Sequence, residues 1–216
     1  MFDKRRIQQG WQMDIRSNNP KTNLNGVLSV SFYSQHGVII VFSSVPLFDN
    51  NWHHVAFTYG GKGRASDINI YIDGKKDTKK DIAFDALNNN SFSNPDSHVE
   101  IGKQETGVPG KVGENYFCGS IDELRIWDGV RSDNDIKANF NRELKGNEPS
   151  LIGYYQFNQG TANDINKGET ILKELTPNHH QGTLYGFTLC DGNCVKPDLT
   201  NSFIPSGYSV LDNDIC

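Results

Sequence analysis

The strongest constraint on the fold is a series of short runs of β-branched and aromatic residues with turn-forming residues between them. In the run GVLSVSFY at residues 26–33, Leu28, Val30 and Phe32 alternate with Ser29 and Ser31, which is the period of a strand with two different faces. Many short strands separated by Gly, Asn and Asp are typical of an antiparallel sandwich or barrel. The runs cover residues 10–15, 26–33, 37–44, 53–59, 68–74, 98–102, 120–127, 151–157 and 182–187.

Two local signals refine this pattern. Asp73-Gly74 lies where a two-residue hairpin turn requires positive φ, so a hairpin is expected there. Between the strand-like runs, Ser132 is followed three residues later by Asp135, which is an N-cap arrangement, and Gly146 follows the basic Lys145. We therefore predict one short helix over about residues 133–144, with the apolar pair of Ile136 and Phe140 covering an edge of the sandwich.

The last part of the chain differs in character. After Phe187 the sequence is rich in turn formers and has no clear periodicity, so we predict a β-sandwich domain over residues 1–187 and a linker or tail of a following module over 188–216. Four cysteines occur, and they allow three complete pairings among which the sequence does not choose. A disulfide-bearing, extracellular chain is the favoured interpretation, and the sequon at Asn89 agrees with it. The cysteines are Cys118, Cys190, Cys194 and Cys216.

Charge and hydropathy exclude several classes of partner. The net charge is −5 and no basic stripe stands out, which argues against nucleic-acid binding, and the lysines of residues 74–80 are expected to form a solvated face. No apolar run approaches the ~20 residues that span a bilayer, so no membrane insertion is expected. The charged start of the chain has no hydrophobic region after it, so any secretion signal would lie outside this sequence.

An ordered set of motifs resembles one family. The set looks like the laminin G-like branch of the concanavalin A-like jelly rolls, which is related to the pentraxins, and it implies an all-β, antiparallel two-sheet jelly-roll sandwich. A flanking segment, LIGYYQFNQG followed by ETILKELTPNHHQGTLYGF, is also similar to one that accompanies such domains. The resemblance covers roughly residues 5–187. The central motifs are NNWHHVAFTYGG at 50–61, INIYIDGKK at 68–76 and FCGSIDELRIWDGVRSDNDI at 117–136.

The chain departs from the family pattern in two ways. Such jelly rolls usually open with strands upstream of a segment like GWQMDI, and little chain precedes Gly10 here, which suggests a fragment of a larger protein or a sandwich completed by residues 151–187. Glu174 stands where the flanking segment usually has Asp, and Pro177 where it has Gly. The second departure affects any calcium site that the resemblance implies.

No catalytic constellation is evident in the sequence. Retaining glycosidases place two carboxylates about 5–5.5 Å apart, and on this fold they use alternate strand positions. Asp122 and Glu123 are adjacent and therefore expected on opposite faces, and Glu100 and Glu105 are five residues apart. A glycan-cleaving enzyme is therefore the least favoured function. The neighbouring His53 and His54 also point to opposite faces of a strand, so a structural role with Trp52 in the core is expected.

Calcium is the most plausible ion for this chain. It takes six to eight oxygen ligands, and the segments FNQGTANDINKG and KELTPNHHQG are rich in side-chain oxygens. The resemblance implies ion ligands in equivalent segments, so the candidate metal ligands are Asp122, Asn158, Glu174 and Asn178. In the alternative, Asn158 and Glu174 close turns through bonds to the backbone, and Asp122 accepts backbone N–H groups on an otherwise apolar face that it shares with Leu124 and Ile126.

The sequence thus predicts a non-catalytic recognition module of a larger extracellular or cell-surface protein, which binds a glycan or an extracellular protein ligand. The alternative is a structural spacer of an adhesin or particle protein, in which calcium serves only stability. Tyr154, Tyr155 and Tyr185 are available to stack on a sugar ring, but alternation sends Tyr154 and Tyr155 to opposite faces, so one of them is expected in the core. The sequence leaves the ligand and the oligomeric state open.

Overall fold

The protein is described by a computed structural model, in which residues 2–6, 9–16, 26–87, 98–104, 115–117, 119–160 and 169–184 are placed well enough for description. The chain divides into two compact units, Met1–Phe117 and Cys118–Cys216, and each is described by itself. The four cysteines, Asn89 and the predicted tail at 188–216 lie outside the described residues. The disulfide, sequon and boundary predictions therefore stay predictions.

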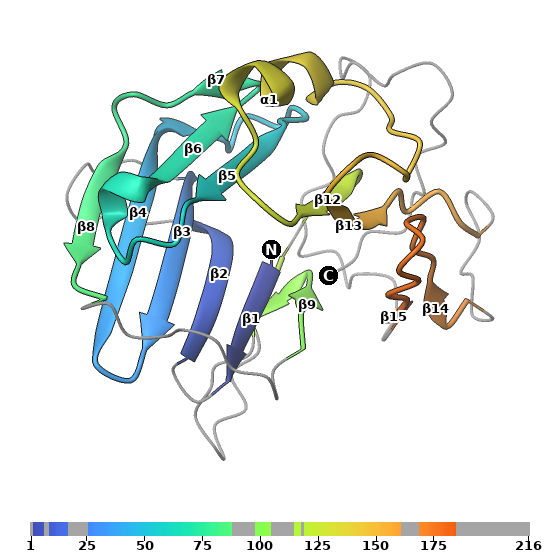
Figure 1. Ribbon diagram of the computed structural model, residues 1–216, viewed down its shortest axis with the longest axis horizontal. Helices are drawn as coiled ribbons and strands as arrows, with labels where there is room; N and C mark the ends of the chain where they lie inside the picture. Colours follow the sequence, from blue (N-terminus) through green and yellow to red (C-terminus); the bar gives the residue numbers. More distant parts are fainter. Residues whose placement is uncertain are drawn as a thin grey trace. The chain divides into compact units, whose positions relative to one another are not determined.

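The first unit is built on a six-stranded antiparallel sheet with the strand order β8-β4-β3-β2-β1-β9 (Figure 1). Four of its strands follow one another in the chain and pair as neighbours, so the centre of the sheet is a meander of short connections. The strands are β1 (Phe2–Arg6), β2 (Gln9–Arg16), β3 (Val27–Ser34), β4 (Gly37–Pro46), β8 (Asp81–Asp85) and β9 (Glu100–Ile101).

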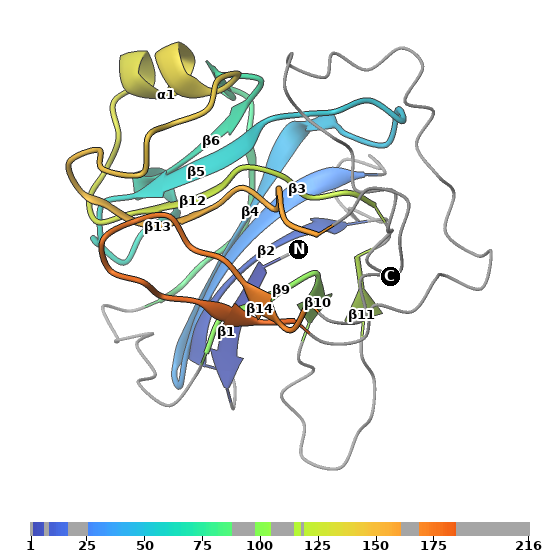
Figure 2. The same ribbon diagram turned by 90° about the vertical axis from the view of Figure 1, so that its right-hand side faces the viewer.

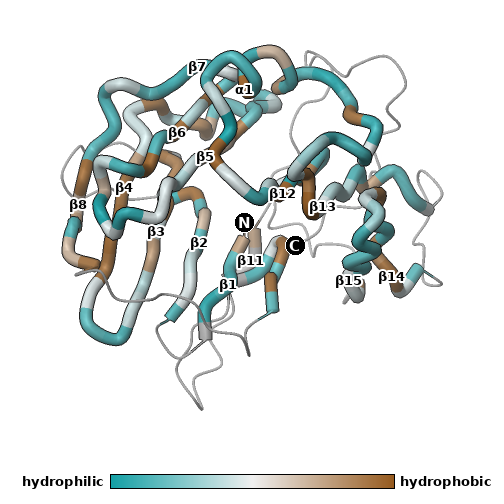
Figure 3. The backbone as a smooth tube through the Cα atoms, in the orientation of Figure 1, coloured by the Kyte–Doolittle hydropathy of each residue, from teal (hydrophilic) through white to brown (hydrophobic). Residues whose placement is uncertain are grey.

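The register gives this sheet one apolar face. Met13 of β2 pairs with Val30 of β3, which pairs in turn with Val41 of β4, and residues paired in this way point to the same side. Val30 and Val41 are fully buried and Met13 is 7% exposed. Figure 3 colours much of β4 and β6 as hydrophobic. The alternation expected for residues 26–33 is therefore present, and its apolar half forms part of the core.

A second, three-stranded sheet with the order β5-β6-β7 packs on that apolar face. The ring of Phe57 lies 6.0 Å from the rings of both Trp11 and Phe32, and the ring of Tyr59 lies 4.4 Å from that of Phe32. The two sheets form the layers seen in Figure 2. The three strands are β5 (Val55–Tyr59), β6 (Ile68–Ile72) and β7 (Lys75–Lys76). The 3-10 turn η1 (Ala65–Asp67) leads into β6, and a short pair, β10 (Lys103–Gln104) with β11 (Asn115–Tyr116), completes the unit.

The predicted hairpin turn at Asp73-Gly74 is confirmed. Both residues have positive φ, 50° and 71°, and Ile72 pairs directly with Lys75 across the turn. This is the backbone conformation that a two-residue turn needs to match the twist of its strands. The Trp52 expectation is only partly met, because its side chain is half-buried.

The second unit contains two strand pairs and a helix. The pairs are β12 (Leu124–Trp127) with β13 (Leu151–Tyr155) and β14 (Ile171–Leu172) with β15 (Gly182–Thr183). Helix α1 (Asp133–Asn139) is the only α-helix in the part of the chain that the structure describes. Its start agrees with the prediction, since the hydroxyl of Ser132 accepts the N–H of Asp135 at 3.1 Å. It ends at Asn139, earlier than the predicted residue 144.

The all-β, antiparallel fold with one short helix is therefore confirmed, whereas several strands escaped prediction. The most informative is β1, which lies upstream of residues 10–15 and pairs with β2 over its whole length. Its sequence, FDKRR, has a single strongly apolar residue, so no alternation marks it as a strand. β1 forms because the backbone of β2 supplies hydrogen-bond partners along its whole length.

Candidate functional site

The face of the six-stranded sheet opposite the core carries a row of polar side chains. Asp3 of β1 pairs with Gln12 of β2, and Gln12 pairs with Ser31 of β3, so the three side chains share one face. Their exposed fractions are 2%, 1% and 0%, and Ser29, one pair further along β3, is also fully buried. Four buried polar residues side by side on a sheet face are unusual, because each loses its hydration on folding.

Charges in this polar row are compensated in pairs. The guanidinium of Arg5 donates two hydrogen bonds to the carboxylate of Asp3, at 2.9 and 2.8 Å, and lies 5.0 Å from the ring centre of Tyr33. Arg16 pairs with Asp14 at 3.0 Å. The side chains of Arg5 and Asp14 are 16% and 15% exposed and that of Arg16 is 38% exposed, so the row opens toward solvent along β2. Each of these two ion pairs is internally balanced in charge. Both pairs also contribute hydrogen-bond donors and acceptors to the row.

Gln12 lies at the centre of the row and is incompletely bonded. Its amide nitrogen donates to Asp14, but its carbonyl oxygen Oε1 is buried and has no hydrogen-bond partner. A buried acceptor without a donor costs about 1–3 kcal/mol, and such groups are rare in folded proteins. The carbonyl oxygen of Gln12 therefore lacks a hydrogen-bond donor among the described residues.

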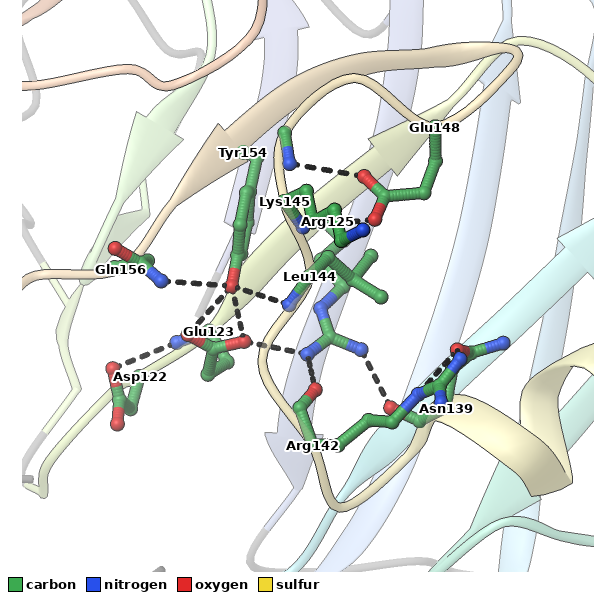
Figure 4. A network of polar contacts seen from close by, with 11 residues as sticks. Asp122, Glu123, Arg125, Asn139, Arg142, Leu144, Lys145, Glu148, Tyr154 and Gln156 are labelled. Atoms are coloured by element: carbon green, nitrogen blue, oxygen red, sulfur yellow. Dashed lines mark hydrogen bonds and ion pairs between the residues drawn. The ribbon is translucent and has the colours of Figure 1, made fainter. Parts of the chain in front are cut away.

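A second polar network surrounds Glu123 in the other unit (Figure 4). The hydroxyl of Tyr154 lies 2.9 and 2.7 Å from the two carboxylate oxygens of Glu123, and Arg125 donates to the same carboxylate at 2.5 Å. The Tyr154 hydroxyl also accepts the backbone N–H of Leu144 at 3.1 Å. Burial, followed by the bond to Glu123, raises the pKa of Tyr154 to about 12. This network ties β12 to β13 and to the segment after the helix.

Arg125 binds the C-terminal end of α1. Its guanidinium donates to the carbonyl oxygens of Asn139, at 2.7 Å, and of Arg142. The last carbonyls of a helix have no partner within the helix, and here a side chain from a strand bonds the carbonyl of the final helical residue, Asn139, while Arg142 lies after the helix. No sequence periodicity reveals this contact, since Arg125 and Asn139 are fourteen residues apart.

Asp122 lies beside this network but does not belong to an apolar strand face. Glu123 has φ of 54° and β12 begins only at Leu124, so the alternation that placed Asp122 with Leu124 and Ile126 is broken at this point. One oxygen of Asp122 accepts the N–H of Glu123 at 2.9 Å. Burial, with the nearby charges of Glu123 and Glu143, raises the pKa of Asp122 to about 7. Asp122 therefore titrates close to neutral pH.

Glu174 serves as an acceptor for backbone groups. Its carboxylate accepts the N–H groups of Tyr154 at 2.9 Å, Thr176 at 2.7 Å and His180 at 3.2 Å. Burial opposes ionisation of this side chain, but these hydrogen bonds outweigh it and lower the pKa of Glu174. A carboxylate with several N–H donors is held in its charged form. This geometry is the turn-closing role that the sequence offered as the alternative to a metal ligand.

The other two predicted ligands lie apart from a common centre. Asn178 donates to the carbonyl of Ile152 at 3.2 Å, and Asn158 is exposed. Among the residues described, no group of three or more His, Cys, Asp and Glu side chains is arranged to hold a metal ion. Asp122 and Glu174 each contact backbone N–H groups, so these residues by themselves do not make the oxygen cage that calcium requires. Calcium binding stays a prediction, and its test is given below.

Sequence reasoning missed both polar networks. The signal for the polar row was present in the alternation of Ser29 and Ser31, but the pairing of Asp3 with Gln12 becomes visible only when β1 joins the sheet. We expected one of Tyr154 and Tyr155 in the core, and the structure places both there. Both are buried, at 0% and 9%, because the hydroxyl of Tyr155 also turns inward to the carbonyl of His180 at 2.5 Å.

Comparison with known proteins identifies the family. The family model described as the concanavalin A-like lectin/glucanases superfamily, laminin G type, matches residues 4–137, which is more than half of the 216 residues. No curated protein and no solved structure matches the chain. In the described residues no helix has the length and apolar character to cross a membrane.

Laminin G-like domains are typically non-catalytic and commonly extracellular, and they serve as carbohydrate- or protein-binding modules. From its match over β1 to α1 and its antiparallel sheets, this chain belongs to the laminin G-like family of the concanavalin A-like superfamily.

Proposed function

We propose that this protein is a non-catalytic recognition module that binds a neutral oligosaccharide on the polar row of its six-stranded sheet. The observation that carries the proposal is the buried, unpartnered carbonyl oxygen of Gln12 at the centre of that row. Because the Gln12 side chain is 1% exposed, the ligand enters the row from its half-exposed Arg16 end, and there a sugar hydroxyl supplies the donor that this oxygen lacks and accepts hydrogen bonds in addition. The family's general role in carbohydrate or protein binding supports the same conclusion.

The charges in the row favour a neutral ligand. Because Arg5 is bonded to Asp3 and Arg16 to Asp14, an anionic ligand would have to compete with an existing carboxylate for each guanidinium. Sugar hydroxyls instead add to the remaining donor and acceptor positions of paired groups. The half-buried ring of Tyr33 lies on the same face and supports the guanidinium of Arg5, which lies 5.0 Å from the ring centre.

The role of a module rather than an enzyme is supported by the positions of the carboxylates. In the polar row Asp3 and Asp14 are each held by an arginine, and in the other unit Glu123 is bonded to Arg125 and Tyr154. Asp122 beside Glu123 has a raised pKa, but the carboxylate of Glu123 is held by Arg125 and Tyr154, so the pair lacks the free carboxylate that glycoside cleavage also uses. An oligosaccharide panel that stays intact after long incubation with the protein supports binding without cleavage.

The test is a glycan array followed by calorimetric titration of the best ligand. Gln12→Met removes the unpartnered acceptor at similar volume, so it should abolish binding. It also removes the amide donor to Asp14, which keeps Arg16 as its partner, so the melting temperature should change little. Arg16→Ala should weaken binding at least tenfold, and Arg64→Ala, which removes an exposed arginine outside the row, should not.

The outcomes separate the site from the function. Glycan binding that survives both Gln12→Met and Arg16→Ala overturns the polar row as the site. A blank array together with a blank pull-down from extracellular protein extracts overturns recognition and leaves the structural spacer of a larger surface protein. Capture of a protein ligand with no glycan bound overturns the choice of carbohydrate.

A further inference from the structure

The imidazole of His53 is bonded on both sides by carboxylates. Its Nδ1 lies 2.9 Å from Asp73, in the turn between β6 and β7, and its Nε2 lies 3.0 Å from Asp49, in the segment between β4 and β5. The side chain of His53 is 18% exposed, whereas those of Asp49 and Asp73 are 49% and 44% exposed. One imidazole ring therefore joins two turns that are distant in the sequence.

This geometry requires a charged ring. An ionised carboxylate only accepts hydrogen bonds, and a neutral imidazole has one donor nitrogen and one acceptor nitrogen. Two simultaneous bonds to carboxylates need both ring nitrogens to carry protons, which occurs only in the imidazolium. The pair of distances thus assigns the protonation state without reference to any titration value.

The two carboxylates are anchored differently. Asp73 accepts the backbone N–H of His54 at 3.0 Å and donates its own N–H to the carbonyl of His54 at 2.8 Å, so it is fixed to the segment just before β5 that carries His53. Asp49 is bonded otherwise to Asn51 of its own turn, at 2.9 Å from the Asn51 N–H. Among the described residues, the bond from His53 joins the carboxylate of Asp49 to the hairpin.

We propose that His53 is a pH-sensitive latch, which as imidazolium holds the turn of residues 49–51 to the Asp73-Gly74 turn and releases the 49–51 turn when it loses its proton. The neutral ring keeps one donor, which stays with Asp73 because that carboxylate is fixed by His54. Its other nitrogen then faces Asp49 with a lone pair and repels it.

The charged neighbours set the direction of the switch. Burial lowers the pKa of His53, but the hydrogen bonds and charges of Asp73 and Asp49, the ionisable groups that act on it, outweigh burial and raise this pKa above its usual value. Hydrogen bonds from Asn51 lower the pKa of Asp49 to about 2, so Asp49 stays ionised throughout. A raised histidine pKa means that the latch stabilises the fold fully at acid pH and loses its effect as pH rises through the folded-state pKa.

The experiment is a two-dimensional NMR titration of the full chain from pH 5 to pH 9. The imidazole signal of His53, assigned through His53→Gln, should titrate with a midpoint above 6.5, and the backbone amides of Asn50 and Asn51 should shift with the same midpoint. In Asp49→Asn the midpoint should fall and the coupled shifts should vanish. His98, which is 77% exposed and lies 2.7 Å from Glu100, is the internal control, and its titration should leave the 49–51 amides unmoved.

Two results would overturn the latch. One is a His53 midpoint at or below 6.5, which means that the ring is neutral in the fold. The other is a normal upward shift of the midpoint with no response from the 49–51 amides, which means that the turn stays in place without its bond. Because Asp49→Asn preserves the size of an exposed side chain, circular dichroism should show it folded, and the parent titration alone decides the proposal if it is not.

Discussion

The hydroxyl of Tyr154 lies within 2.9 Å of both carboxylate oxygens of Glu123, thirty-one residues earlier in the chain. This contact joins neighbouring strands through side chains and places a fully buried phenol against an ion pair. In Tyr154→Phe the carboxylate keeps Arg125 but loses its phenol donor, and the N–H of Leu144 loses its acceptor. We expect a loss of about 1–3 kcal/mol in the free energy of unfolding, measured by urea denaturation. Tyr33→Phe, at a half-buried tyrosine outside this network, is the control for a general effect of removing a tyrosine hydroxyl. An unchanged midpoint in Tyr154→Phe contradicts the role of this network.

Asp122 makes the stability of the protein depend on pH near neutrality. Its pKa in the fold, about 7, lies above the usual value of 3.8, so the folded state holds a proton that the unfolded state releases between these values. Stability should therefore fall as pH rises from about 4 to 7, with each unit of pKa difference worth about 1.4 kcal/mol. In Asp122→Asn this loss should be smaller, as measured by thermal melts at a series of pH values. Parallel curves for parent and variant across this range would refute the assignment.

Glu174 should have the opposite pH dependence. Its pKa is lowered in the fold, so the stability it contributes is complete above the usual pKa of 4.5 and is lost as pH falls through the folded-state pKa. Glu174→Gln should melt earlier than the parent at pH 7, and the difference between the two should shrink in acid. Equal melting temperatures at pH 7 would show that the three backbone donors find other acceptors.

Calcium distinguishes the two roles of Glu174. If the ion is bound, about 100 Kd of calcium adds about 2.7 kcal/mol, which a melting curve detects and a chelator reverses. In that case Asn158→Ala, which alters an exposed residue, should abolish the calcium effect without changing the melt in chelator. A parent melt that is insensitive to both calcium and chelator removes the metal prediction and leaves Glu174 as a turn-closing residue.

Gly10 is required by the pairing of β1 with β2. Its φ is 131°, and a Cβ atom at this position would lie 1.9 Å from the carbonyl oxygen of Lys4 in the neighbouring strand. Gly10→Ala should therefore displace β1 and unfold the protein at a much lower urea concentration. Gly61→Ala is the matched control, because φ is 86° there and nothing lies within 4 Å of the added Cβ atom. This substitution should cost only about 1–2 kcal/mol of backbone strain. Equal effects of both substitutions would show that the close approach of β1 is unimportant.

The sequence by itself determined the local elements of this protein. The Asp73-Gly74 turn, the Ser132 cap of α1 and the strand at residues 27–34 depend on residues a few positions apart, so their physical causes are visible in the order of residues. The ordered set of motifs from Trp52 to Ile136 also identified the family. These motifs lie on successive strands, so their order along the chain is itself a property of the fold.

Only the tertiary structure decided where the polar groups meet. The bonds of Tyr154 to Glu123, of Arg125 to the end of α1 and of His53 to Asp49 and Asp73 depend on which strands become neighbours and in which register. The same holds for the polar row, in which Gln12 gains Asp3 and Ser31 as neighbours only through pairing with β1 and β3. Hydrogen bonds act over about 3 Å in space and have no preferred separation along the chain, which is why no pattern in the sequence announced them.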